Sequence, residues 1–164
     1  MVENIKVVEK KEVFLLSYLG ESYVRLELAK MGYKVLGTTP GFFFDLLGED
    51  GKKIEVKTAT PSTSTSNRHG NLYQYKQWQF RLSSPKQATN PDFYVCVLIN
   101  NVKDPPIGYF IFPKDSIETY AKDRSGIISI FESDLEGKVK MVNKLNRHQY
   151  LNKWGLITEK KINS

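Results

Sequence analysis

The sequence predicts an α/β fold, in which helices and strands follow one another within one compact domain spanning residues 1–164. Three observations support this prediction. Residues 13–31 carry apolar side chains at helical spacing, residues 45–58 place a turn between two strand-like runs, and residues 93–99 form the continuous apolar run of a buried strand. Hydrophobic residues make up 40% of the chain and aromatic residues 12%, which is enough for a real core.

The first expected element is a helix over about residues 13–31, with Gly32 in the position of its C-terminal cap. Val24 and Leu28 share one line of this helix with Glu21. A carboxylate on an apolar line has two interpretations. Either Glu21 lies at the edge of the apolar stripe in water, or it is directed at a functional site.

A β-hairpin is expected next, with Asp45 on its first strand, a three-residue loop at 49–51 and a returning strand at 54–58. If Gly48 faces Lys52, Asp45 faces Glu55. Because side chains alternate along a strand, the side chain of Lys57 then lies on the same face as that of Glu55. The hairpin therefore gathers two carboxylates and an amine.

Facing carboxylates suit a divalent cation, because like charges repel unless a positive charge lies between them. Oxygen ligands favour a hard ion, so Mg²⁺ is expected, with Mn²⁺ as its substitute. A bound cation activates water and neutralises charge on a phosphate, and Lys57 is placed to position that water or to stabilise the transition state. The pattern thus predicts metal-assisted phosphodiester hydrolysis; the alternative is a surface hairpin with ordinary charges.

The remaining elements follow from apolar runs, alternation and turn residues. They are a strand at 33–36, a mobile Ser- and Thr-rich loop at 58–70, a strand at 77–82, a short helix at 84–90, a strand at 109–112, a helix at 114–122, a strand at 127–131 leading to a turn at 136–137, and a helix at 143–154 closed by Gly155. On the strand at 77–82, Gln79 alternates with buried aromatic positions. It either faces the site as a minor catalytic residue or points outward as an ordinary polar residue.

The net charge of +6 indicates a polyanionic partner. The region 138–164 carries an excess equal to that whole charge, in Lys138, Lys140, Lys144, Arg147, Lys153, Lys160 and Lys161 against Glu159. Its cations are either phosphate contacts or a solvated face, with Lys144, Arg147 and Lys153 available to phosphate. Between Glu55 and Asp92 there is no acidic residue, and the cations of this segment are interleaved with Tyr73, Tyr75 and Trp78. The nucleic-acid contacts expected there are Arg68, Lys76, Arg81 and Lys86.

Composition also excludes several classes of protein. Cys96 is the single cysteine, so an internal disulfide is impossible, and two histidines with one cysteine support neither a zinc cluster nor a Cys-His catalytic pair. No apolar stretch reaches the length needed to span a membrane, and the N-terminus lacks the pattern of a secretory leader. An intracellular, cytoplasmic protein is expected.

The order of a helix with Glu21, a strand with Asp45 and a strand with Glu55-Val56-Lys57 resembles the PD-(D/E)XK nuclease superfamily over roughly residues 13–112. This resemblance implies a restriction endonuclease-like core, a central mixed β-sheet flanked by helices. It also implies that Asp45, Glu55 and the backbone carbonyl of Val56 hold Mg²⁺, and that Glu21 reaches the metal directly or through water.

One departure from the family pattern is Phe44, which stands where a proline often precedes the first aspartate. A literal Pro91-Asp92 occurs later, but no Glu-x-Lys or Asp-x-Lys follows it at hairpin distance. The sequence therefore predicts a Mg²⁺-dependent DNA endonuclease of restriction, homing or junction-resolving type, acting as a homodimer because two strands are cut. The alternatives are a nucleic-acid-binding module of the same fold without catalysis and an RNA-directed nuclease.

Overall fold

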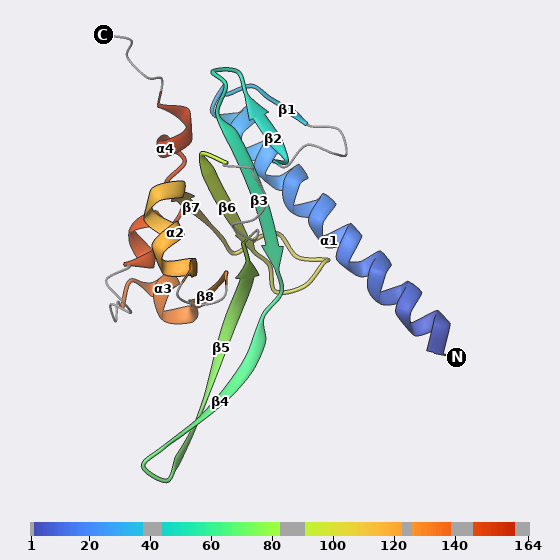
Figure 1. Ribbon diagram of the computed structural model, residues 1–164, viewed down its shortest axis with the longest axis vertical. Coiled ribbons are helices and arrows are strands. Elements are labelled where there is room, and N and C mark those ends of the chain that lie inside the picture. Colours follow the sequence, from blue (N-terminus) through green and yellow to red (C-terminus); the bar gives the residue numbers. More distant parts are fainter. Residues whose placement is uncertain (1, 38–43, 83–90, 123–125, 139–145, 160–164) are drawn as a thin grey trace.

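The computed structural model describes residues 2–37, 44–82, 91–122, 126–138 and 146–159 (Figure 1). In chain order the elements are α1 (Val2–Lys30), β1 (Val35–Gly37), β2 (Leu46–Gly48), β3 (Lys53–Ala59), β4 (Ser62–Arg68), β5 (Asn71–Arg81), β6 (Phe93–Leu98), β7 (Gly108–Pro113), α2 (Lys114–Lys122), β8 (Ile127–Phe131), α3 (Glu132–Glu136), a 3-10 helix η1 (Arg147–Tyr150) and α4 (Gly155–Thr158). The expected helix at 84–90 lies outside the described residues.

The central sheet has five strands in the order β1-β2-β3-β6-β7. β3 and β6 run parallel, and the other neighbours are antiparallel. The parallel pair is possible because more than thirty residues separate the two strands, room for the crossover that parallel neighbours require. The expectation of a mixed sheet flanked by helices is confirmed.

One face of this sheet packs against the C-terminal half of α1. Val24 and Leu28 of the helix are fully buried in a cluster that includes Ile54, Val56 and Val95 of the sheet. Even positions of β3 thus face α1, because side chains alternate along a strand. Odd positions, including Glu55 and Lys57, are directed to the other face.

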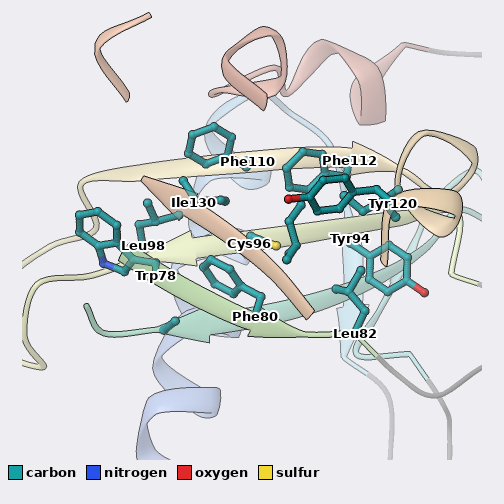
Figure 2. Close-up of a cluster of buried hydrophobic side chains, with 13 residues drawn as sticks. Trp78, Phe80, Leu82, Tyr94, Cys96, Leu98, Phe110, Phe112, Tyr120 and Ile130 are labelled. Atoms are coloured by element: carbon teal, nitrogen blue, oxygen red, sulfur yellow. The ribbon is translucent and has the colours of Figure 1, made fainter. Parts of the chain in front are cut away.

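The other face packs against a three-stranded antiparallel sheet in the order β4-β5-β8. Figure 2 shows Trp78 and Phe80 of β5 packed with Cys96 and Phe110 of the central sheet, and Ile130 of β8 lies in the same cluster. The predicted alternation over residues 77–82 is confirmed on its apolar side. Cys96 is fully buried and free, and burial raises the pKa of its thiol.

The predicted mobile loop at 58–70 is wrong, because β4 occupies most of it. β4 pairs with β5 at seven successive positions, from Ser62 opposite Gln77 to Arg68 opposite Asn71. A strand exposed on both faces has no apolar alternation to reveal it, and a run of Ser and Thr without such alternation predicts a loop. The turn at 69–70 held the signal, since a glycine between two runs marks a tight hairpin.

Two helix boundaries also differ from expectation. α1 begins at Val2 rather than near residue 13, since residues 2–12 are mostly good helix formers without a breaking residue. The predicted end of the helix before Gly32 is confirmed, and the φ of 74° at that glycine is typical of a C-terminal cap. The helix expected over 143–154 is reduced, where it is described, to the 3-10 helix η1. Leu151 forms a β-bridge with Phe110, and the amide of Asn152 donates to the Tyr109 carbonyl at 2.6 Å, so the chain after η1 follows the edge of β7 instead of continuing a helix.

Candidate functional site

The β2–β3 hairpin brings Asp45 to the edge of β3. Leu46 pairs with Ile54 and the amide of Gly48 donates to the Lys52 carbonyl at 2.8 Å, while the amide of Asp45, just before β2, donates to the Ile54 carbonyl. The φ of 86° at Gly51 is the left-handed conformation expected of the glycine in this loop. The predicted hairpin register is therefore confirmed from Gly48 opposite Lys52 to Leu46 opposite Ile54, whereas the pairing of Asp45 with Glu55 stays a prediction.

The carboxylate of Asp45 is fixed at the edge of β3. Its Oδ2 accepts a hydrogen bond from the Val56 amide at 2.7 Å, and its own amide donates to the Ile54 carbonyl at 3.0 Å. β2 begins only at Leu46, so Asp45 lies where the strand pairing opens. Its side chain continues the pairing that the backbone of β2 would otherwise provide.

The backbone of Val56 faces the same edge. Carbonyls at odd positions of β3 point to the neighbouring strand β6, since Lys53 accepts from Asp92 and Ala59 accepts from Ile99, whereas the Ile54 carbonyl points to the β2 side. Because the amide and carbonyl of a strand residue point to the same side and alternate along the strand, the Val56 carbonyl is directed to the side of Asp45. An oxygen ligand from the backbone is thus available beside the carboxylate.

Glu21 reaches this site from α1. Its carboxyl group hydrogen-bonds the Asp45 side chain, and its pKa is raised to about 7 by burial and by the Asp45 charge, against the opposing effect of Arg25. Gly20 permits this approach, because a Cβ on that residue would lie 1.7 Å from the Thr58 hydroxyl oxygen. Glu21 is thus half-buried against Asp45 rather than lying in water at the edge of the apolar stripe.

Glu55 and Lys57 lie together on the odd face of β3, as the alternation predicts. Lys57 Nζ is 2.8 Å from Glu55 Oε1, with 30% of the lysine side chain and 9% of the glutamate side chain exposed. An amine held by one carboxylate and open to solvent can donate to a further anion or to a water. Glu55 is buried in this arrangement, with Lys57 as an ion-pair partner for its carboxylate.

The four side chains divide into two contacts rather than one cluster of ligands. Glu21 bonds Asp45, Glu55 pairs with Lys57, and no group of three His, Cys, Asp or Glu side chains within the described residues is arranged to hold a metal ion. Mg²⁺ does not require three, since it usually takes one or two carboxylates and fills its shell with waters and phosphate oxygens. The closeness of Glu21 and Asp45 also suits a cation. Near neutral pH a proton on Glu21 reduces the repulsion between the two carboxyl groups, and a bound metal ion would reduce the same repulsion.

Gln79 lies apart from this arrangement. It pairs with Ser129 of β8, within the three-stranded sheet, and its side chain is exposed on the face opposite Trp78 and Phe80. Of the two interpretations of Gln79, its position is that of the outward polar residue.

The cations expected to meet nucleic acid take different positions along the β4–β5 hairpin. Arg68 is exposed at the end of β4, and Arg81 is exposed at the end of β5. Lys76 is half-buried, with its amine 2.8 Å from Asn100 Oδ1 and 5.0 Å from the centre of the Trp78 ring. Lys86 lies outside the described residues.

Arg147 is not available to phosphate, so its assignment to a phosphate-binding tail is wrong. Its guanidinium lies 2.8 Å from the Asp134 carboxylate, contacts the Tyr120 hydroxyl and covers the Phe131 ring. A charge pairing thirteen residues away along the chain leaves no local pattern in the sequence. Lys153 is exposed, and Lys144 lies outside the described residues.

No protein-family profile and no curated protein matches the sequence. Among solved structures, the chain is similar to a bacterial homing endonuclease, I-Ssp6803I, with a TM-score of 0.55 and 20% sequence identity over 87% of this chain and 90% of that one. The chain shares the fold of that protein. Within the part of the chain that is described, no helix combines the length and apolar character needed to cross a membrane.

Proposed function

We propose that this protein is a Mg²⁺-dependent endonuclease that hydrolyses phosphodiester bonds in DNA. The observation that carries the proposal is a pair of contacts at β3: Glu21 bonds Asp45, whose carboxylate accepts from the Val56 amide, and Lys57 pairs with Glu55 on the same strand. The fold shared with a homing endonuclease supports it, as does a net charge of +6. The motif places the chain, by this proposal, in the PD-(D/E)XK superfamily.

Asp45, Glu55 and the Val56 carbonyl would hold Mg²⁺, with Mn²⁺ as substitute, and Glu21 would support the same site. The bound ion supplies an acidified water and neutralises charge on the phosphate that is attacked. The protein supplies geometry. The Val56 amide holds the Asp45 carboxylate in place at 2.7 Å, so little freedom is lost when a cation is bound.

Lys57 has the role of orienting the attacking water or stabilising charge on the phosphate. Its amine is already held at 2.8 Å by Glu55, and its partial exposure lets a substrate phosphate approach it. Glu21 carries a proton on a substantial fraction of molecules near pH 7. Loss of that proton leaves a second carboxylate beside Asp45 for the metal shell.

The fold similarity favours cutting of the homing type over restriction or junction resolution. Cutting both strands of a duplex requires two sites, which a homodimer with a two-fold axis would provide. A module that binds nucleic acid without cutting it has no need of Glu21, Asp45, Glu55 and Lys57 together. The site therefore favours the enzyme.

The test is incubation of the protein with supercoiled plasmid, four-way DNA junctions and structured RNA, in Mg²⁺ or in EDTA. We expect metal-dependent DNA cutting that Asp45→Asn abolishes and Asp115→Asn retains, because Asp115 is an exposed aspartate on α2 outside the site. Cutting of RNA alone would assign the RNA-directed alternative. Tight binding without cutting of any substrate would assign the binding module, and unchanged cutting by Asp45→Asn would overturn the site.

A further inference from the structure

The β4–β5 hairpin forms a two-stranded arm, residues 62–76, that extends away from the two sheets (Figure 1). β5 pairs with β8 only from Gln77 onward, so among the described residues no third strand joins the arm. Its tip is a two-residue turn in which His69 and Gly70 have φ values of 54° and 78°. Two successive positive φ values are those of a type I′ turn, which matches the natural twist of a tight hairpin.

The base of the arm is fixed to the protein. Lys76 bonds Asn100 and lies over Trp78, the Gln77 side-chain amide donates to the Ser64 hydroxyl, and Tyr75 packs edge-on against Phe131 with ring centres 5.6 Å apart. The tip has no comparable anchoring. Leu72 exposes 69% of its surface and Tyr73 exposes 51%.

Alternation sorts the arm into two faces. One face presents Asn67 beside Leu72 and Thr65 beside Gln74, and all four side chains are exposed. The other face carries Tyr73 and Tyr75 of β5 next to serines of β4, with Ser66 opposite Tyr73. The first face, which we call the amide face (Thr65, Asn67, Leu72 and Gln74), offers two carboxamides and two side chains ending in methyl groups.

This chemistry matches the major-groove edges of A·T base pairs. A carboxamide can accept from adenine N6 and donate to adenine N7 at once, and a Leu or Thr methyl group can contact the thymine methyl. A two-stranded β-ribbon fits the major groove, which is about 12 Å wide, since its strands are only about 4.8 Å apart. With no acidic residue between Glu55 and Asp92, the arm also meets no repulsion from phosphates.

We propose that the arm lies in the major groove of duplex DNA and that its amide face reads A·T base pairs there. This inference rests on the proposed function, because it identifies how the cut DNA is selected. The arm is joined directly to the site, since β3 carries Glu55 and Lys57 and only two residues separate β3 from β4. Reading and cutting are thus coupled by one continuous stretch of backbone.

The length of this connection sets where the bases are read. Arg68 lies eleven positions after Lys57 in the sequence, and at about 3.3 Å per position this stretch spans at most about 36 Å. One helical turn of DNA is about 34–36 Å. The bases read by the arm therefore lie within about one turn of the phosphate that is cut.

A second copy of the chain is the competing occupant. β4 is an edge strand of its sheet, and an edge can pair with the same edge of another molecule. The exposed side chains of β4 are all polar, however, which weakens the case for a buried interface between subunits.

The test selects duplexes with a randomised central segment on the full-length protein, with Ca²⁺ in place of Mg²⁺ to allow binding without cutting. We expect a consensus rich in A·T pairs. Leu72→Ala together with Gln74→Ala should reduce its preference by about 5- to 150-fold, the range of one bidentate base contact. The matched control is Leu156→Ala together with Gln149→Ala, an exposed leucine and glutamine on α4 and η1, which should leave the consensus unchanged.

Base analogues then locate the contact. Replacing thymine by uracil removes the methyl group and should weaken wild-type binding about fourfold per contacted methyl, with no further loss in Leu72→Ala. An unchanged consensus in the arm variant overturns the inference, as does a change in oligomeric state confined to that variant. Because selection is scored by binding, loss of all cutting with a retained arm-dependent consensus would refute the proposed function alone.

Discussion

Two ion pairs of the same length have different surroundings in this protein. Lys57 lies 2.8 Å from Glu55 at the candidate site, and Arg147 lies 2.8 Å from Asp134 beneath α3. The second pair is closed, with 3% of each side chain exposed, and the Phe131 amide also donates to the Asp134 carboxylate. The first pair is open on the side of the lysine, of which 30% is exposed.

The difference indicates which pair can bind a substrate. Arg147 gives its donors to Asp134 and Tyr120, so no phosphate can reach it without breaking buried hydrogen bonds. Lys57 can keep Glu55 and still donate to another oxygen, because an ammonium has three donors. A closed pair stabilises the fold, whereas an open pair leaves its lysine accessible to an anion.

The largest effect on the fold should come from Arg147→Met, which leaves the Asp134 charge buried without its partner. We expect a loss of about 3–5 kcal/mol in the free energy of unfolding, measured by urea denaturation. Lys153→Met removes an exposed cation from the neighbouring segment and should change stability by less than about 0.5 kcal/mol. Equal losses in the two variants would show that the closed pair has no special structural role.

Lys57→Met, unlike Arg147→Met, should affect DNA cutting more than stability. We expect DNA cutting to fall by about 10²- to 10³-fold, because a group aimed at developing charge is lost. The loss in the free energy of unfolding should be smaller than in Arg147→Met, because water can reach the open side of this pair and solvate Glu55 in place of the lysine. Cutting is measured under single-turnover conditions at saturating Mg²⁺. A variant that keeps full cutting but unfolds as readily as Arg147→Met would exchange the roles assigned to the two pairs.

The open pair could be predicted from the sequence and the closed pair could not, for a physical reason. Glu55 and Lys57 are two residues apart on a strand whose register the Gly51 turn fixes, so local rules suffice to place them. Asp134 and Arg147 meet only through tertiary packing, so the sequence alone predicts a phosphate contact for the arginine and gives no sign of its partner. Glu21 could be predicted in part. Its position on the apolar line of a helix follows from the sequence, but its contact with Asp45 depends on tertiary packing.

The same distinction holds for the fold. Apolar patterns predicted β6, β8 and α2 within a residue at each end, since burial controls these elements. β4 is held by backbone pairing with β5 alone, and the segment after η1 is held by the edge of β7. Neither pairing leaves an apolar period in the sequence.

Glu21 should make the stability of the protein depend on pH, with a smaller effect than the two substitutions above. Its pKa is about 7 in the folded protein and near 4.5 when unfolded, so the stability it contributes is fully present below about pH 4.5 and is lost as the pH rises through 7. Glu21→Gln cannot ionise beside Asp45. We expect its Tm relative to wild type to rise between about pH 5 and about pH 8, whereas Glu136→Gln, at an exposed glutamate on α3, should show no such trend.

The smallest expected effect links that proton to the metal. Mg²⁺ and the proton shared by Glu21 and Asp45 compete for the same oxygens, so binding of the ion should release a proton. Well below pH 7 the apparent Mg²⁺ affinity should therefore increase by up to about tenfold per pH unit and become constant above it. Thermal shift titrations with Mg²⁺ alone, without DNA, measure this affinity at several pH values.

In Glu21→Gln the pH dependence of the Mg²⁺ affinity should disappear, because that carboxamide binds no proton in this range. A Mg²⁺ affinity that stays constant from about pH 5 to about pH 8 in the wild type would mean that the ion does not bind at the carboxylate pair, and the open site would then lose its assignment as a metal centre.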